Sequence, residues 1–115
     1  MVKFGRFPEQ TAQSLGAESA LLALDDAGLT IHDVDALYAG NLLRANDTIG
    51  QRILQLIGQT GIPVINVANA CATGATAFRE AVSAVRAGMC EVALVVGTEQ
   101  MGRAGLLGGG GATPM

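Results

Sequence analysis

The chain alternates helix-type and strand-type segments, and this alternation restricts its fold more than any other feature of the sequence. Apolar residues at helical spacing predict three helices, over residues 9–27, 48–57 and 73–87. Short apolar stretches predict three strands, over residues 35–40, 63–69 and 91–97. The expected order is α-β-α-β-α-β. Such an order favours parallel strands joined by right-handed crossover helices, so we expect a three-layer αβα sandwich with a mostly parallel sheet.

The third predicted helix carries two kinds of apolar residue. Its larger apolar residues share one face, together with one alanine: Ala75, Phe78, Val82 and Val85. Small residues lie beside that face: Ala77, Ala81 and Ala84. A helix with this pattern is expected to pack against a sheet.

A chain of this type that begins on a helix normally has a strand before it. Here Met1–Phe4 supplies at most the last residues of one, so we expect the sheet to be incomplete. We divide the chain into a partial domain over residues 1–104 and a glycine-rich loop over residues 105–115. A sheet that lacks a strand leaves backbone groups unpaired, so association with another chain is expected.

Composition and charge exclude several classes of function. A net charge of −3 and a pI near 4.9 provide no basic surface for nucleic acid or an anionic membrane. No apolar run approaches the roughly 18 residues that a membrane span needs, and the N-terminus lacks the apolar region of a signal peptide. The two cysteines form no disulfide framework, which indicates a reducing, cytoplasmic location.

Cys71 has the sequence context of a nucleophile. The strand over residues 63–69 leads directly into Ala70-Cys71-Ala72-Thr73-Gly74, where the third helix begins. The free N–H groups and the positive end of a helix dipole favour a thiolate there, and the small neighbours leave room for a carbonyl carbon. Serine hydrolases present their nucleophile on a similar strand-to-helix turn. Free cysteines are more often small buried hydrophobes, but this context favours a functional residue.

Several separated motifs resemble the thiolase superfamily, especially its archaeal and sterol-carrier-protein-X-type members. They are NACATG, AFREAVSAVRAG, EVALVVGTEQM, the N-terminal KFGRFPEQTAQSLGAESALLALDDAGL and LYAGNLL. The resemblance covers nearly the whole chain. It implies the N-terminal part of an acyl-CoA acyltransferase with the thiolase-like fold, a family of lipid metabolism.

The resemblance also implies residue roles. Cys71 corresponds to the nucleophile that takes an acyl group from acyl-CoA as a thioester, in Claisen condensation or in thiolysis of 3-ketoacyl-CoA. Its backbone N–H corresponds to an oxyanion-hole donor, and Met101 resembles a residue that lines the substrate pocket. Coenzyme A thioesters are then the substrates, no further cofactor or metal is implied, and the complete enzyme is expected to be a homodimer or homotetramer.

The family's activating histidine, its second acid/base group and its water-binding asparagine correspond to segments beyond residue 115. This chain alone is therefore expected to be inactive. Two alternatives stay open. One is a ketoacyl-ACP synthase or HMG-CoA synthase, which share the fold and a nucleophilic cysteine, although the YAGN and EQM segments favour thiolase. The other is a non-catalytic or split subunit that a partner chain completes.

Four other features are expected to play no chemical part. Cys90 precedes a strand and is predicted to be structural, and His32 lies in a linker and is predicted to be solvated. Glu99, at a strand end, could act as an acid or base, but an anchoring role is favoured. The glycines at 108–111 follow no phosphate-binding fingerprint and are predicted to be loop.

Overall fold

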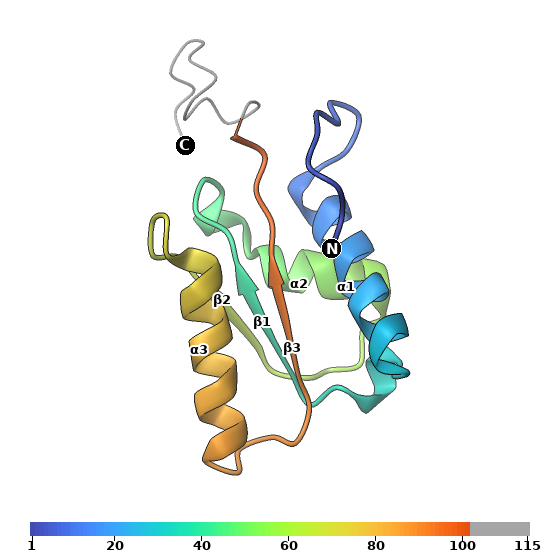
Figure 1. Cartoon of the computed structure of the whole chain (residues 1–115), viewed down its shortest axis with the longest axis vertical. Coiled ribbons are helices and arrows are strands. Elements are labelled where there is room, and N and C mark those ends of the chain that lie inside the picture. The colour runs from blue at the N-terminus through green and yellow to red at the C-terminus, as the bar shows by residue number, and fades with distance from the viewer. Residues whose placement is uncertain (102–115) are drawn as a thin grey trace.

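The computed structural model describes residues 1–101 of the chain (Figure 1). The predicted order of helices and strands is confirmed, with two added 3₁₀ turns: α1 (Ala12–Ala27), η1 (Ile31–Asp33), β1 (Ala36–Gly40), η2 (Ala45–Asp47), α2 (Ile49–Ile57), β2 (Val64–Val67), α3 (Thr73–Arg86) and β3 (Ala93–Gly97). The glycine-rich loop predicted over residues 105–115 lies outside the described residues. Within residues 1–101 no helix has the length and apolar character of a membrane span.

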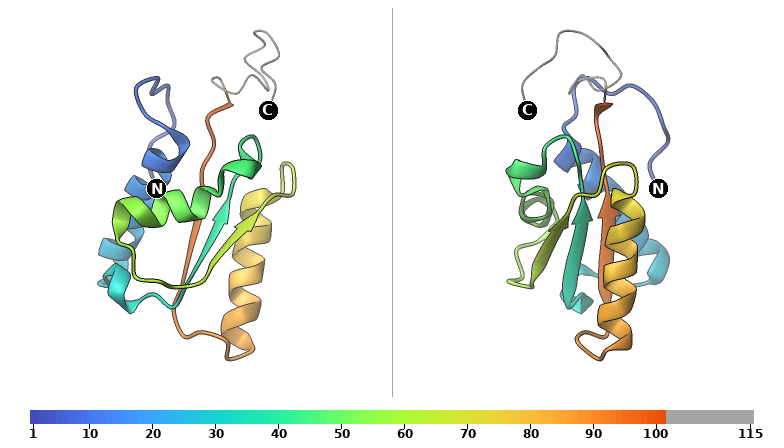
Figure 2. Two further views of the ribbon diagram at one scale, coloured as in Figure 1. Left: turned by 180° about the vertical axis from the view of Figure 1, so that it is seen from behind. Right: turned by 90° about the vertical axis from the view of Figure 1, so that its left-hand side faces the viewer.

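The three strands form a parallel sheet in the order β2-β1-β3. β1 lies in the middle, where Tyr38 pairs with Ile65 on one side and with Val95 on the other. Because β2 and β3 lie on opposite sides of β1, right-handed crossovers place α2 and α3 on opposite faces of the sheet. Figure 2 shows these layers, and the expected αβα architecture is confirmed. The free edges of the described sheet are β2 and β3.

Helix α1 begins later than the predicted range of residues 9–27. The side chain of Thr11 accepts a hydrogen bond from the Ser14 N–H, and the Ser14 hydroxyl accepts one from the Thr11 N–H. This reciprocal cap ends the preceding turn, so the predicted start at Glu9 was wrong by three residues. At the other end Gly28 has φ 72°, a left-handed conformation that glycine adopts without strain.

Each face of the sheet has its own apolar core. On the face covered by α1 and α2, large aliphatic residues are buried, among them Leu37 and Ile53. On the other face α3 packs small residues against Ala36 and Tyr38: Ala77, Ala81 and Ala84.

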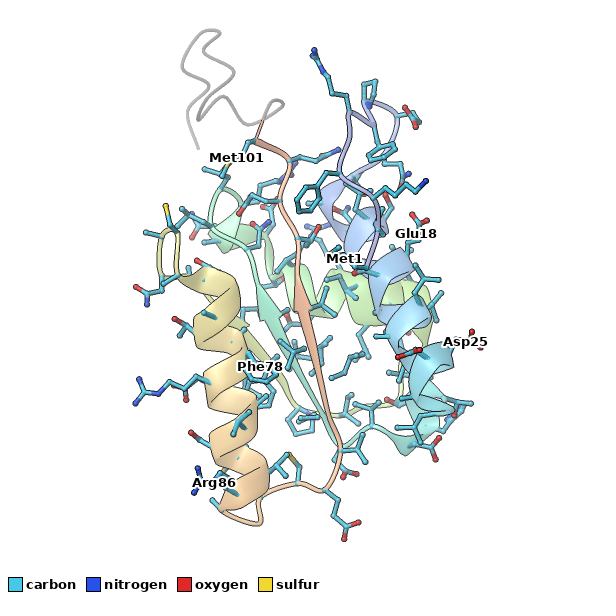
Figure 3. All side chains as sticks on the ribbon, in the orientation of Figure 1. Met1, Glu18, Asp25, Phe78, Arg86 and Met101 are labelled. Carbon is cyan, nitrogen blue, oxygen red and sulfur yellow. The ribbon has the colours of Figure 1, made fainter. Side chains whose placement is uncertain are left out.

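The larger apolar face of α3 is turned away from the sheet. Phe78, Val82 and Val85 are 62%, 38% and 41% exposed, and Ala75 is also exposed. Alanines let the helix axis approach the sheet closely, whereas the larger side chains would hold it away. The residues of α3 that pack on the sheet are therefore the small alanines, and not the larger apolar residues that share a face in the sequence pattern. We call the exposed residues Phe78, Val82 and Val85 the outer face of α3; Phe78 is labelled in Figure 3.

Helix α2 crosses the sheet at very close range, and Gly50 permits this approach. A Cβ atom on Gly50 would overlap the side chain of Val64 and lie 3.1 Å from the Cβ of Ala39. The N–H of Gly50 also donates to Asn66 Oδ1 at 2.7 Å, which ties the start of α2 to β2.

Replacing Gly50 with alanine is expected to lower the free energy of unfolding by about 1–3 kcal/mol, the usual effect of overpacking a core. Gly74→Ala is the matched control, because a Cβ there meets nothing within 4 Å and alanine favours a helix. Urea denaturation followed by circular dichroism measures both. Equal stability of the two variants would contradict the close approach of α2.

Candidate functional site

All three strands end at the same edge of the sheet, because they are parallel, and the candidate site lies there (Figure 1). Ligands of open α/β sheets bind beyond the carboxyl ends of the strands. Cys71 follows the end of β2 and precedes α3, as the sequence predicts, and its side chain is exposed.

The turn that carries Cys71 is held by Thr73. Ala70 has φ 47°, a left-handed conformation that costs a residue with a Cβ roughly 1–2 kcal/mol. The hydroxyl of Thr73 accepts a hydrogen bond from the Asn69 N–H and donates one to the Ala70 carbonyl, both at 2.7 Å. Thr73 itself is buried, while Asn69 and Ala70 are exposed. The two hydrogen bonds hold the residues on both sides of Cys71 in one conformation.

The glycine that ends β1 lies under this turn. A Cβ on Gly40 would lie 2.9 Å from Thr73 Cγ2, whereas a Cβ on Gly97, at the end of β3, would make an ordinary contact 3.8 Å from the Cα of Gly74. The missing side chain at Gly40 lets Thr73 sit so low on the sheet. The position of Cys71 therefore depends on β1 as well as on β2, the strand that leads to it.

An open pocket of about 1140 Å³ extends from the cysteine turn. One wall is made by Cys71 and its neighbours, a second by the segment Gly97–Met101, and a third by the N-terminal arm Met1–Pro8. Met101, labelled in Figure 3, is 39% exposed and lies in the lining with Cys71. Cys71 and Met101 thus line one pocket, and the substrate-binding role of Met101 that the resemblance implies stays a prediction.

The wall that contains Met101 is anchored by the three residues before it. The hydroxyl of Thr98 donates to the Ala12 carbonyl at 2.7 Å, and Gln100 Nε2 donates to the Gln10 carbonyl at 2.6 Å. The carboxylate of Glu99 accepts N–H bonds from Leu42 at 2.8 Å and from Leu43 at 3.3 Å. Glu99 thus has an anchoring role, the one the sequence favoured. The acid/base alternative is disfavoured, since both of its oxygens already accept hydrogen bonds.

Asn41 is a residue of this region to which sequence reasoning gave no role. It follows β1 directly, is 2% exposed, and donates from Nδ2 to the Thr98 carbonyl at 2.6 Å and to Glu99 Oε2 at 3.1 Å. The available signal was an amide placed directly after an entirely apolar strand. Its partners could not be found, because they are 57 and 58 residues away in the sequence.

The other reactive residues lie away from the pocket. His32 is exposed in η1, at the amino end of β1 and so at the opposite edge of the sheet from Cys71. Cys90 follows the far end of α3 and packs against its core. Among the described lining residues of the pocket Glu99 is the one acidic group, and residues 1–101 contain no cluster of metal-ligand type.

The comparisons with known proteins agree on one family. The family model described as thiolase, N-terminal domain, matches residues 1–108. Acetyl-CoA acetyltransferase of Methanocaldococcus jannaschii is 37% identical over 103 residues, which cover 86% of this chain and 26% of that protein. Sterol carrier protein 2 of Homo sapiens is 38% identical over 106 residues, covering 91% of this chain and 19% of that protein.

A solved structure supports the fold. The crystal structure of 3-oxoacyl-[acyl-carrier-protein] synthase III from Aquifex aeolicus VF5 superposes with a TM-score of 0.77 at 20% sequence identity. The match covers 83% of this chain and 32% of that one. Compared with its sequence relatives, this chain spans about a quarter of their length or less. On the match of residues 1–108, the chain belongs to the thiolase family and corresponds to its N-terminal domain.

Proposed function

We propose that this chain carries the nucleophile of an acyl-CoA acyltransferase and that Cys71 is that nucleophile. The observation that carries the proposal is the exposed thiol on a rigid strand-to-helix turn, at the carboxyl edge of a parallel sheet and inside the family match. The names of the relatives, which include acetyl-CoA acetyltransferases, support acyl transfer as the reaction class.

The proposed chemistry has two steps. In the first, the Cys71 thiolate attacks the carbonyl carbon of an acyl-CoA, a thioester forms on Sγ, and coenzyme A leaves as its thiolate, which takes a proton. In the second, the α-carbon of another acyl-CoA, after losing a proton to a base, attacks that thioester and releases Cys71 with a new carbon–carbon bond. Thiolysis of a 3-ketoacyl-CoA is the reverse. The backbone N–H of Cys71 is proposed to stabilise the oxyanion.

The base for these steps is proposed to come from outside residues 1–101. An activated cysteine normally needs a general base within hydrogen-bond reach. The chain has one histidine, His32, which lies at the opposite edge of the sheet, and Glu99 is held by three donors. A longer protein of this family, or a partner chain, would therefore have to supply the group that activates Cys71.

We also propose that this chain packs against further protein. The partner is the rest of a complete thiolase subunit, the other subunits of a homodimer or homotetramer, or a separate chain that completes a split subunit. The outer face of α3 is apolar and exposed, and β2 and β3 have free edges. Contiguous exposed apolar residues on a helix are typical of an interface. The alternative of a ketoacyl-ACP synthase has the same fold but only 20% identity to this chain.

The 115-residue chain is expected to show no turnover with acetoacetyl-CoA and coenzyme A, because its thiol lacks a base. The rate of thiolysis is measured by the loss of absorbance of the Mg²⁺ enolate of acetoacetyl-CoA. Thiolysis that depends on Cys71, absent in Cys71→Ser, would contradict the proposed need for an outside base.

Iodoacetamide is expected to label Cys71 faster than Cys90 near neutral pH, since Cys71 is exposed on a tight turn and Cys90 packs against the core of α3. Peptide mass spectrometry over a time course gives both rates in one sample, so Cys90 is the internal control. Equal rates would count against Cys71 as the presented nucleophile.

Val82→Glu is expected to weaken self-association of the chain by about tenfold or more, because an unpaired charge in an apolar contact costs several kcal/mol. Ser83→Glu is the matched control: Ser83 is exposed on α3 but outside its outer face. Sedimentation velocity over a concentration series compares the two. A monomeric wild-type chain at every concentration, or equal weakening by both variants, would contradict an α3 interface between copies of this chain.

A further inference from the structure

Asn41 is the point at which the ends of all three strands are joined. It directly follows β1, its backbone N–H donates to the carbonyl of Val67 at the end of β2, and its Nδ2 donates to the carbonyl of Thr98 just after β3. The distances are 3.2 and 2.6 Å. The residue is 2% exposed, so these bonds are made without competition from water.

The amide of Asn41 is fully used, and Glu99 completes its surroundings. Asn41 Oδ1 accepts the N–H of Arg44 at 2.9 Å, while Nδ2 faces two acceptors, the Thr98 carbonyl and Glu99 Oε2. The carboxylate of Glu99 also accepts the N–H groups of Leu42 and Leu43. An amide is suited to this place because it offers donors on one side and an acceptor on the other. We call the side chains of Asn41 and Glu99 the strand-end clamp.

Asn41 links the two sides of the pocket, one through its backbone and the other through the strand-end clamp. Cys71 is the fourth residue after Val67, whose carbonyl accepts the backbone N–H of Asn41. The segment Thr98–Met101, which the clamp holds through Thr98 and Glu99, lines the same pocket as Cys71. A change in the clamp would therefore move this segment relative to the backbone of Asn41, and so relative to the strand end that leads to Cys71.

We propose that Asn41 and Glu99 are positioning residues for Cys71, which set the width of the pocket between the thiol and the segment Thr98–Met101. Neither residue touches the reacting atoms in this role. The proposal rests on the proposed function in one respect, namely that the pocket binds an acyl substrate. The geometry of the clamp does not depend on which acyl group binds.

The experiment measures how strongly the pocket discriminates by size. Cys71 of the 115-residue chain is alkylated with the small reagent iodoacetamide and, separately, with the bulky reagent N-phenylmaleimide. For each variant, the rate constant for N-phenylmaleimide is divided by the rate constant for iodoacetamide, which gives the size ratio. Because both reagents attack the same thiolate, changes in its protonation cancel in the ratio. Cys90, at the far end of α3, gives a second ratio in the same samples.

Two substitutions break the strand-end clamp with little change of volume. Asn41→Asp replaces the donor that faces Thr98 and Glu99 with an acceptor, and Glu99→Gln places an N–H group against N–H donors in either orientation of its amide. Each is expected to raise the ratio at Cys71 about threefold or more, the scale of one lost hydrogen bond, and to leave the ratio at Cys90 unchanged.

Controls separate positioning from general loosening. Asn66→Asp introduces the same chemical change at an exposed residue of β2, where Oδ1 still accepts the N–H of Gly50, so its ratio should equal that of the wild type. The double variant Asn41→Asp, Glu99→Gln restores an amide–carboxylate pair with the roles exchanged and should return part of the way to the wild-type ratio. Circular dichroism establishes which variants fold.

The outcomes are distinct. Unchanged ratios at Cys71, or parallel changes at Cys71 and Cys90, would overturn the proposal, as would a double variant no closer to wild type than the single ones. If Asn41→Asp does not fold, Glu99→Gln decides, because Glu99 is only half-buried. Failure of the acyl-transfer proposal would appear instead as equal labelling rates of Cys71 and Cys90 in the wild type. That result would not change how the size ratio at Cys71 responds to substitutions in the clamp, so the two proposals can fail separately.

Discussion

The parallel pairing of β1 with both of its neighbours is the constraint on which the rest of the structure depends. β1 is buried along all its length and hydrogen-bonded to β2 and β3, so its direction sets theirs. Right-handed crossovers then require α2 and α3 to cover opposite faces. The same pairing brings the ends of the three strands to one edge. The cysteine turn, the pocket wall and Asn41 meet there for that reason, although they are far apart in the sequence.

The candidate site depends on close packing as much as on hydrogen bonds. Gly40 lets Thr73 reach the end of the sheet, and Thr73 then holds the strained Ala70 beside Cys71. α3 can lie so near the sheet because alanines form its inner surface. The larger apolar residues of α3 are left facing outward, where a monomeric domain of this size would gain nothing from them. The site and the exposed face of α3 are therefore two consequences of one short distance between helix and sheet.

Membership of the thiolase family and the local position of Cys71 could be predicted from the sequence with good accuracy. The order of the elements was correct, because each element depends on residues within a few positions of one another. The start of α1 was missed, since the reciprocal Thr11–Ser14 cap that fixes it was not recognised in the sequence. The anchoring role favoured for Glu99 agrees with the structure, but its three donors had no signature in the sequence.

Local sequence patterns were enough to predict where helices and strands form, that the sheet would be parallel, and that a cysteine would lie on a strand-to-helix turn. These follow from periodicity, caps and small residues, which act over short distances along the chain. The buried face of α3 and the contact of Asn41 with Glu99 across 58 residues became apparent only in the folded chain. Such contacts depend on the order of strands in the sheet and on the distance between layers, and neither is encoded in any single segment.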